Sequence, residues 1–138
     1  MVSNSFPTPE MALTHILVVS DVPASNRWYR DVLGAKPYRE YGTSAVLSFN
    51  GVWLLLVEGG DPTPDKPDVV FEPPDRRKAS HSFTVRVEDC HAAYDTLKDR
   101  GAEFLTPPYG WDGETRCFFP DLDGHLWEIS QIATETHT

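Results

Sequence analysis

Three side chains of the kind that bind metals interrupt segments that otherwise resemble β-strands. His15 and His81 each stand at the start of a strand-like segment, and Glu128 lies between Trp127 and Ile129 in another. Two imidazoles and one carboxylate on separate strands form a set that binds Fe(II), Mn(II), Zn(II) or Ni(II) and leaves positions open for chemistry. The spacing alone leaves alternatives, because a strand-end histidine is commonly a surface or core residue and Glu128 would suit a solvent-facing position.

A pocket around such a site would use further side chains of the same strands. Arg116 is a candidate partner for an anionic oxygen of a substrate, with a solvated strand arginine as the alternative. Four aromatic residues are candidates for lining a pocket for a flat ligand, with an ordinary core role as the alternative: Trp53, Tyr109, Trp111 and Phe118. His125 follows a turn glycine, so we expect it to be exposed.

The first half of the chain predicts the elements that would position half of these residues. A strand, a helix and three further strands are expected at 13–20, 24–34, about 37–41, 44–49 and 52–58. Asp21 is the expected N-cap of the helix, and Gly34 is its expected stop. Asn50-Gly51 predicts a tight hairpin turn between the last two strands.

The second half predicts the same order of elements. A strand, a helix and three strands are expected at 81–88, 90–100, 102–106, 114–119 and 125–131. Asp89 is the expected N-cap, Cys90 belongs to the apolar stripe of the helix, and Asp123-Gly124 predicts the last turn. Alternation in the first of these strands places His81 on one face with the apolar residues Phe83, Val85 and Val87.

The repeat predicts an α+β fold of two βαβββ modules, at 12–58 and 80–132, joined by a proline- and glycine-rich linker at 59–79. Residues 1–11 and 133–138 are expected to be flexible ends. A unit that cannot bury its sheet alone is expected to pair with its copy. We therefore expect helices on the outer faces and a curved mixed sheet around a metal-binding cavity.

Composition limits the partners of the chain. The formal net charge is −9 over 138 residues, from 12 Lys and Arg against 21 Asp and Glu. Such a charge repels nucleic acids and anionic membranes and tolerates a cationic ligand. No apolar run approaches the roughly 20 residues that span a bilayer. The N-terminal stretch does not resemble a secretory signal and the cysteines form no C-x-x-C pair, so a cytoplasmic setting is expected.

Three segments resemble the vicinal oxygen chelate superfamily, which includes glyoxalase I, bleomycin-resistance proteins and extradiol dioxygenases. They are "THILVVSDVPASNRWYRDVLG" (14–34), "SHSFTVRVEDCHAAYDTLKDRGAEF" (80–104) and "FFPDLDGHLWEIS" (118–130). The last contains a D-P-D-G-x-x-x-E-like motif in which Leu122 replaces the proline. The resemblance covers residues 12 to 132 and implies the glyoxalase-like fold.

The resemblance also implies roles for particular residues. His15, His81 and Glu128 match three metal ligands of the family, and Glu128 is in addition a candidate catalytic group. The fourth ligand of glyoxalase I corresponds to Leu55, which cannot bind a metal and would only line the pocket. Glu58 is near but has the opposite strand parity, so it should face away.

The implied function is a divalent-metal-dependent enzyme that chelates neighbouring oxygens of a small substrate, with dioxygenase-type chemistry slightly favoured. The alternatives are a bleomycin-resistance type of antibiotic-sequestering protein and a glyoxalase-type lyase or isomerase. A homodimer is expected, and the metal site would lie within one chain or between two. Neither the substrate nor the metal follows from the residues.

Overall fold

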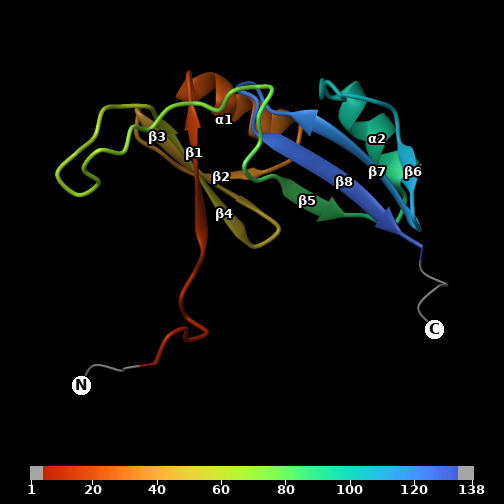
Figure 1. The fold of residues 1–138 in the computed structure, drawn as a ribbon, viewed down its shortest axis with the longest axis horizontal. Helices are drawn as coiled ribbons and strands as arrows, with labels where there is room; N and C mark the ends of the chain where they lie inside the picture. Colours follow the sequence, from red (N-terminus) through yellow and green to blue (C-terminus); the bar gives the residue numbers. More distant parts are fainter. Residues whose placement is uncertain (1–4, 134–138) are drawn as a thin grey trace.

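Two four-stranded sheets with the same internal order form the framework of residues 5–133, the part of the chain that the computed structural model describes (Figure 1). The orders are β1-β4-β3-β2 and β5-β8-β7-β6, which confirms the predicted pair of βαβββ modules. In each sheet the first and last strands of the module are parallel neighbours. The strands are β1 (Thr14–Val19), β2 (Lys36–Glu40), β3 (Ser44–Phe49), β4 (Val52–Glu58), β5 (Phe83–Arg86), β6 (Tyr109–Trp111), β7 (Glu114–Pro120) and β8 (Leu126–Ile132).

Each helix begins after the aspartate that the sequence predicts. Asp21 caps α1 (Val22–Asp31) and Asp89 caps α2 (Cys90–Asp99), and each carboxylate accepts a backbone N–H of the first turn at 3.0 Å. Helix α1 starts at residue 22 instead of the predicted 24 because Pro23 suits the first turn, where a missing N–H leaves no bond unmade.

Two strand predictions in the second module need correction. Residues 102–106 form no strand, and a single bond from the Leu105 N–H to the Phe118 carbonyl (2.9 Å) ties them to β7. The two prolines that follow, Pro107 and Pro108, donate no ladder hydrogen bonds, so regular pairing with β7 starts only at Tyr109. The strand predicted at 81–88 is likewise shorter, because β5 pairs with β8 only over residues 83–86.

Both modules share one hydrophobic core. Helix α1 covers its own sheet and also reaches the second one: the Trp28 ring lies 6.3 Å from that of Phe119, and the Tyr29 ring lies 5.9 Å from that of Trp127, centroid to centroid. In Figure 1 both helices lie along the same side of the sheets. Neither helix within residues 5–133 is long and apolar enough to cross a membrane.

The linker predicted at 59–79 is irregular but anchored at both ends. Gly60 and Phe71 exchange two backbone hydrogen bonds (2.8 and 2.9 Å), which close the linker on itself. Arg76 then donates from Nη1 to the carbonyl of Leu122 at 2.8 Å. This contact holds the end of the linker against the turn between β7 and β8, next to the residues of the candidate sites.

Candidate functional site

Glu128 lies in the middle of β8, on the face of the second sheet that points away from the core. Its neighbours in register are Thr84 of β5 and Phe118 of β7, and paired residues share a face. Trp127 and Ile129 take the opposite face and belong to the core. We call the face that carries Thr84, Phe118 and Glu128 the inner face; it is the face of the second sheet opposite to the hydrophobic core. Although it lies on this face, Glu128 is only 7% exposed.

The two carboxylate oxygens of Glu128 have different surroundings. Oε1 accepts a hydrogen bond of 2.6 Å from the hydroxyl of Thr84. Oε2 is buried and has no hydrogen-bond partner among residues 5–133, and it lies 3.7 Å from Nη1 of Arg116. A buried carboxylate oxygen without a hydrogen bond is unfavourable by about 1–3 kcal/mol. This position therefore favours a ligand that donates a hydrogen bond.

Arg116 is held on the inner face by aromatic rings and a second carboxylate. Its guanidinium carbon lies 5.9 Å from the centroid of the Trp111 ring and 5.6 Å from that of Phe118. Nη1 also lies 3.7 Å from Oε1 of Glu114, and the other oxygen of Glu114 bonds to Ser130. The guanidinium of Arg116 therefore lies between the carboxylates of Glu114 and Glu128. The rings of Trp111 and Phe118 lie beside it.

The two histidines of the predicted metal set lie elsewhere. The ring centroids of His15 and His81 are 5.2 and 5.6 Å from that of Phe83, and both rings meet it edge-on. Phe83 in turn stacks on Trp127 at 4.4 Å, on the core side of the second sheet. The imidazoles therefore gather around a core-side aromatic residue, whereas Glu128 points to the inner face.

A metal centre within one chain is therefore not formed by this set. Among residues 5–133, no group of three or more His, Cys, Asp and Glu side chains is placed to hold a metal ion. The reason is strand parity: His15 is paired with the core residue Leu54 and His81 contacts Phe83, so neither shares the face of Glu128. The donor chemistry suits a divalent metal, but the geometry of a single chain does not.

Two atoms of the set nevertheless lack a hydrogen-bond partner within residues 5–133. They are Nδ1 of His15 and Oε2 of Glu128, and both are buried. Such atoms in a native protein call for an explanation, and an ion or a ligand is one of them. The two atoms belong to different sheets, because His15 lies on β1 and Glu128 on β8.

The other predicted pocket residues divide between the two sheets. Tyr109, Trp111, Arg116 and Phe118 lie on the inner face with Glu128, as their register with β7 and β8 requires. Trp53 and Leu55 belong to the first sheet, where they line a hollow of about 330 Å³ with Tyr38 and Val46. Glu58 has the parity of the core residues Leu54 and Leu56 in an unbroken β4 register, so it faces away from Leu55 as expected.

His125 was missed, because the sequence predicts it to be exposed. Its exposure is only 8%, and its Nδ1 lies 2.8 Å from Oδ2 of Asp121. The aspartate that precedes the turn was the available signal, since Asp side chains commonly bond to the backbone of their own turn. Asp121 does so here and leaves one oxygen for the imidazole.

The two cysteines are buried in the core and offer no nucleophile. The Cys90 and Cys117 sulfurs lie 4.0 Å apart, with exposures of 0% and 1%. Burial raises the pKa of the Cys117 thiol to about 12, and it raises the pKa of Cys90 as well. Since the thiolate is the reactive form, these residues serve as packing groups, as the helical stripe predicts for Cys90.

Comparison with known proteins places this geometry in a broader context. The family model described as the Glyoxalase/Bleomycin resistance protein/Dioxygenase superfamily matches residues 12–129. The chain is 32% identical over 118 residues to a metallothiol transferase FosB of Staphylococcus haemolyticus, covering 80% of this chain and 76% of that protein.

Solved structures agree with the fold. A glyoxalase/bleomycin resistance protein/dioxygenase from Nocardioides superposes with a TM-score of 0.69 at 25% identity, covering 92% of this chain and 86% of that one. The fosfomycin resistance protein FosX from Listeria monocytogenes superposes with a TM-score of 0.66 at 15% identity, covering 95% and 100%. At that identity the second likeness concerns the fold alone.

Proposed function

Because the chain belongs to the Glyoxalase/Bleomycin resistance protein/Dioxygenase superfamily, we propose that it binds a small polar molecule on the inner face of the second sheet, with Glu128 as the central group. The observation that carries this proposal is the buried Oε2 of Glu128, which accepts no hydrogen bond from the part of the chain that the structure describes. A ligand whose hydroxyl or ammonium group donates a hydrogen bond to this oxygen would remove the free-energy cost of burying the oxygen without a hydrogen bond.

The surroundings of Glu128 favour a flat, cationic or hydroxyl-bearing ligand. Trp111 and Phe118 provide aromatic surface next to Arg116, and Glu114 adds a second carboxylate. The net charge of −9 favours a cation and disfavours an anion at long range. Arg116 would then fix the orientation of a ligand oxygen.

The role that fits these features best is sequestration of a small antibiotic-like molecule. The superfamily model includes bleomycin resistance proteins in its description. Sequestration needs a complementary surface and no reactive centre. The single chain supplies such a surface at Glu128.

A metal-dependent enzyme is the second candidate, supported by the two unpaired atoms and by the name of the FosB relative, a metallothiol transferase. Glu128, His15 and His81 would be the donors, and a homodimer would be needed to combine donors of two chains. A divalent metal in such a site polarises substrate oxygens. The residues do not select dioxygenase, lyase or transferase chemistry, or one of Fe(II), Mn(II), Zn(II) and Ni(II).

Elemental analysis separates the two candidates. The untagged protein would be purified without chelator and compared with the variants Glu128→Gln, His15→Ala and His81→Ala, with the exposed Glu103→Gln as the matched control. Sequestration predicts substoichiometric metal in all five proteins. Stoichiometric metal that is lost in the three site variants and kept in Glu103→Gln would replace sequestration by the metal-dependent enzyme.

A further inference from the structure

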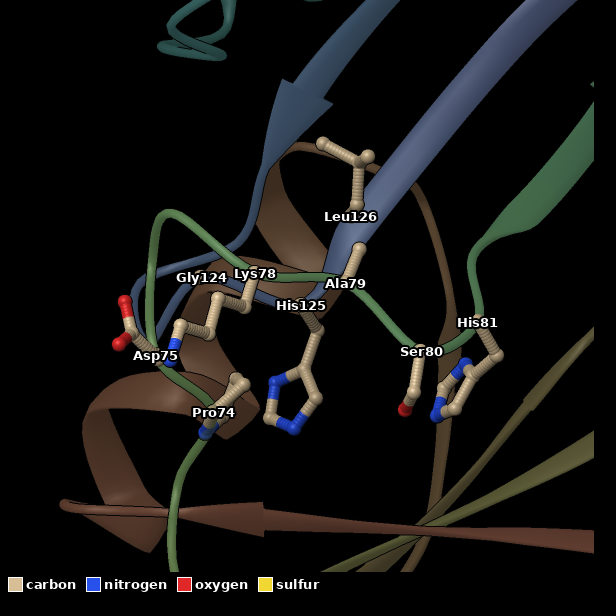
Figure 2. A pocket seen from close by; sticks show the side chains of 9 residues that line it. All are labelled: Pro74, Asp75, Lys78, Ala79, Ser80, His81, Gly124, His125 and Leu126. Atoms are coloured by element: carbon tan, nitrogen blue, oxygen red, sulfur yellow. The ribbon is translucent and has the colours of Figure 1, made fainter.

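A second cavity lies between the end of the linker and the turn that joins β7 to β8. It has a volume of about 200 Å³. Figure 2 shows the imidazole of His125 beneath the linker, between Pro74 and Ser80, with Lys78 on one side and His81 on the other. Glu128 is not part of its wall, so this cavity is separate from the inner face.

The wall of this cavity contains the imidazole of His125, which is held by the carboxylate of Asp121. Both oxygens of that carboxylate accept hydrogen bonds. Oδ1 of Asp121 accepts three backbone N–H groups at 2.9 Å, those of Asp123, Gly124 and His125. Its Oδ2 accepts the Tyr29 hydroxyl at 2.6 Å and lies 2.8 Å from Nδ1 of His125. Although burial opposes it, the bonds from His125 and Tyr29 lower the pKa of Asp121 below its usual value. Asp121 is therefore an ionised acceptor.

This arrangement determines which nitrogen of His125 is available. An ionised carboxylate cannot donate, so the proton of the contact must belong to Nδ1 of His125. In the neutral ring Nε2 then carries the lone pair. Within residues 5–133 Nε2 has no hydrogen-bond partner, and it is not among the buried unpaired atoms. Nε2 is therefore open to the cavity as an acceptor.

The other polar side chains of the wall are those of Asp75, Lys78, Ser80 and His81. The ammonium of Lys78 makes no ion pair or hydrogen bond with the described part of the chain, and the hydroxyl of Ser80 makes no hydrogen bond there. Oδ1 of Asp75 accepts the backbone N–H of Arg77 at 2.9 Å. Pro74, Ala79 and Leu126 add apolar surface. The cavity thus combines the positioned lone pair of His125 with the cation of Lys78, beside the imidazole of His81 and the carboxylate of Asp75.

We propose that this cavity binds a small hydroxy acid, with the ligand's hydroxyl donating to Nε2 of His125 and its carboxylate pairing with Lys78. The two complementary groups match the acceptor and the cation of the wall, and the volume suits a compact molecule. The Asp121 carboxylate positions the ring and increases its strength as an acceptor. Glu128 does not line this site, and His81 is the residue that it shares with the second candidate function.

Glycolate and acetate form a matched pair of probes, because they differ in the hydroxyl group. Nitrogen-15 spectra of the histidine side chains would follow each titration of the full chain. We expect glycolate to shift the Nε2 signal of His125 saturably and acetate to bind about tenfold more weakly, the effect of one hydrogen bond to a charge-supported group. Equal responses to the two acids, or no saturable shift with glycolate, would overturn the proposal.

Variants test the two contacts separately. Lys78→Met should weaken glycolate binding about tenfold, whereas Lys98→Met, on α2, should leave it unchanged. Lys78 is exposed, so its loss should not impair folding, unlike a change at the buried His125. Glu128→Gln should bind glycolate like wild type. A loss in Glu128→Gln would assign the probe to the inner face instead.

Discussion

The hydroxyl of Thr84 donates to Oε1 of Glu128 at 2.6 Å across two parallel strands, while Oε2 of the same carboxylate has no hydrogen bond within the described residues 5–133. A histidine that binds a metal together with Glu128 would have to lie on the same face of the second sheet, either on β5 or on the segment before it. There the in-register neighbour is a threonine, and His81 instead meets Phe83. This relationship explains why Glu128 is not part of a three-donor centre within residues 5–133.

Replacing Thr84 by valine should destabilise the protein by about 1–2 kcal/mol, because Glu128 would be left without any hydrogen bond. Thr84→Ser keeps the hydroxyl and is the matched control, with a smaller loss. Urea unfolding followed by tryptophan fluorescence measures both. Equal stability of Thr84→Val and wild type would show that the bond contributes nothing.

We expect Tyr29→Phe to lower the free energy of unfolding by about 1–3 kcal/mol. The variant removes the bond to Asp121 and the acceptor of Trp127 Nε1 (3.2 Å), both of them buried contacts between the two modules. Tyr38→Phe, at an exposed position, is the control and should change little. Thermal unfolding of the three proteins at neutral pH gives the comparison, and identical midpoints would contradict the network.

The decrease in the free energy of unfolding at low pH should depend on Asp121. Its pKa is lower in the folded protein than the ordinary value of about 3.9, so its contribution is complete above that value and is lost as the pH falls further. Asp121→Asn should be less stable than wild type at pH 7. The difference between their free energies of unfolding should become smaller below about pH 4. Urea titrations across this range test it, and a constant gap would refute the linkage.

The thiols should resist alkylation in the native state. Burial raises the pKa of Cys117 to about 12, and both sulfurs are inaccessible. At pH 8 we expect iodoacetamide to label Cys90 and Cys117 at the rate of global unfolding and rapidly in urea. Mass spectrometry of the labelled peptides provides the rates. Fast native labelling of either residue would show that the core opens locally.

Local signals in the sequence predicted the local structure well. Asp21 and Asp89 cap the helices, and Asn50-Gly51 forms a hairpin turn with positive φ angles of 46° and 84°. Each of these features depends on a few neighbouring residues and on the conformations they tolerate. The βαβββ repeat followed from the order of such signals.

The site was harder to predict because it depends on pairing between distant segments. Which residues lie on the face of Glu128 is decided by the β5–β8 register, and one residue of difference moves a side chain to the other face. The alternation in the sequence had already grouped His81 with Phe83, and the structure agrees. His125 was missed because its burial depends on Tyr29 and Asp121, which are far apart in the chain.

Titration calorimetry of the metal-free protein with bleomycin, alongside fosfomycin as a small anion, tests the central claim most directly. After treatment with chelator, wild type should bind bleomycin with unit stoichiometry and Glu128→Gln should bind it about tenfold more weakly, because a neutral amide replaces the carboxylate. Glu103→Gln and His15→Ala should match wild type. Binding that appears only after a divalent metal is restored, and that is lost in His15→Ala and His81→Ala, would contradict the account.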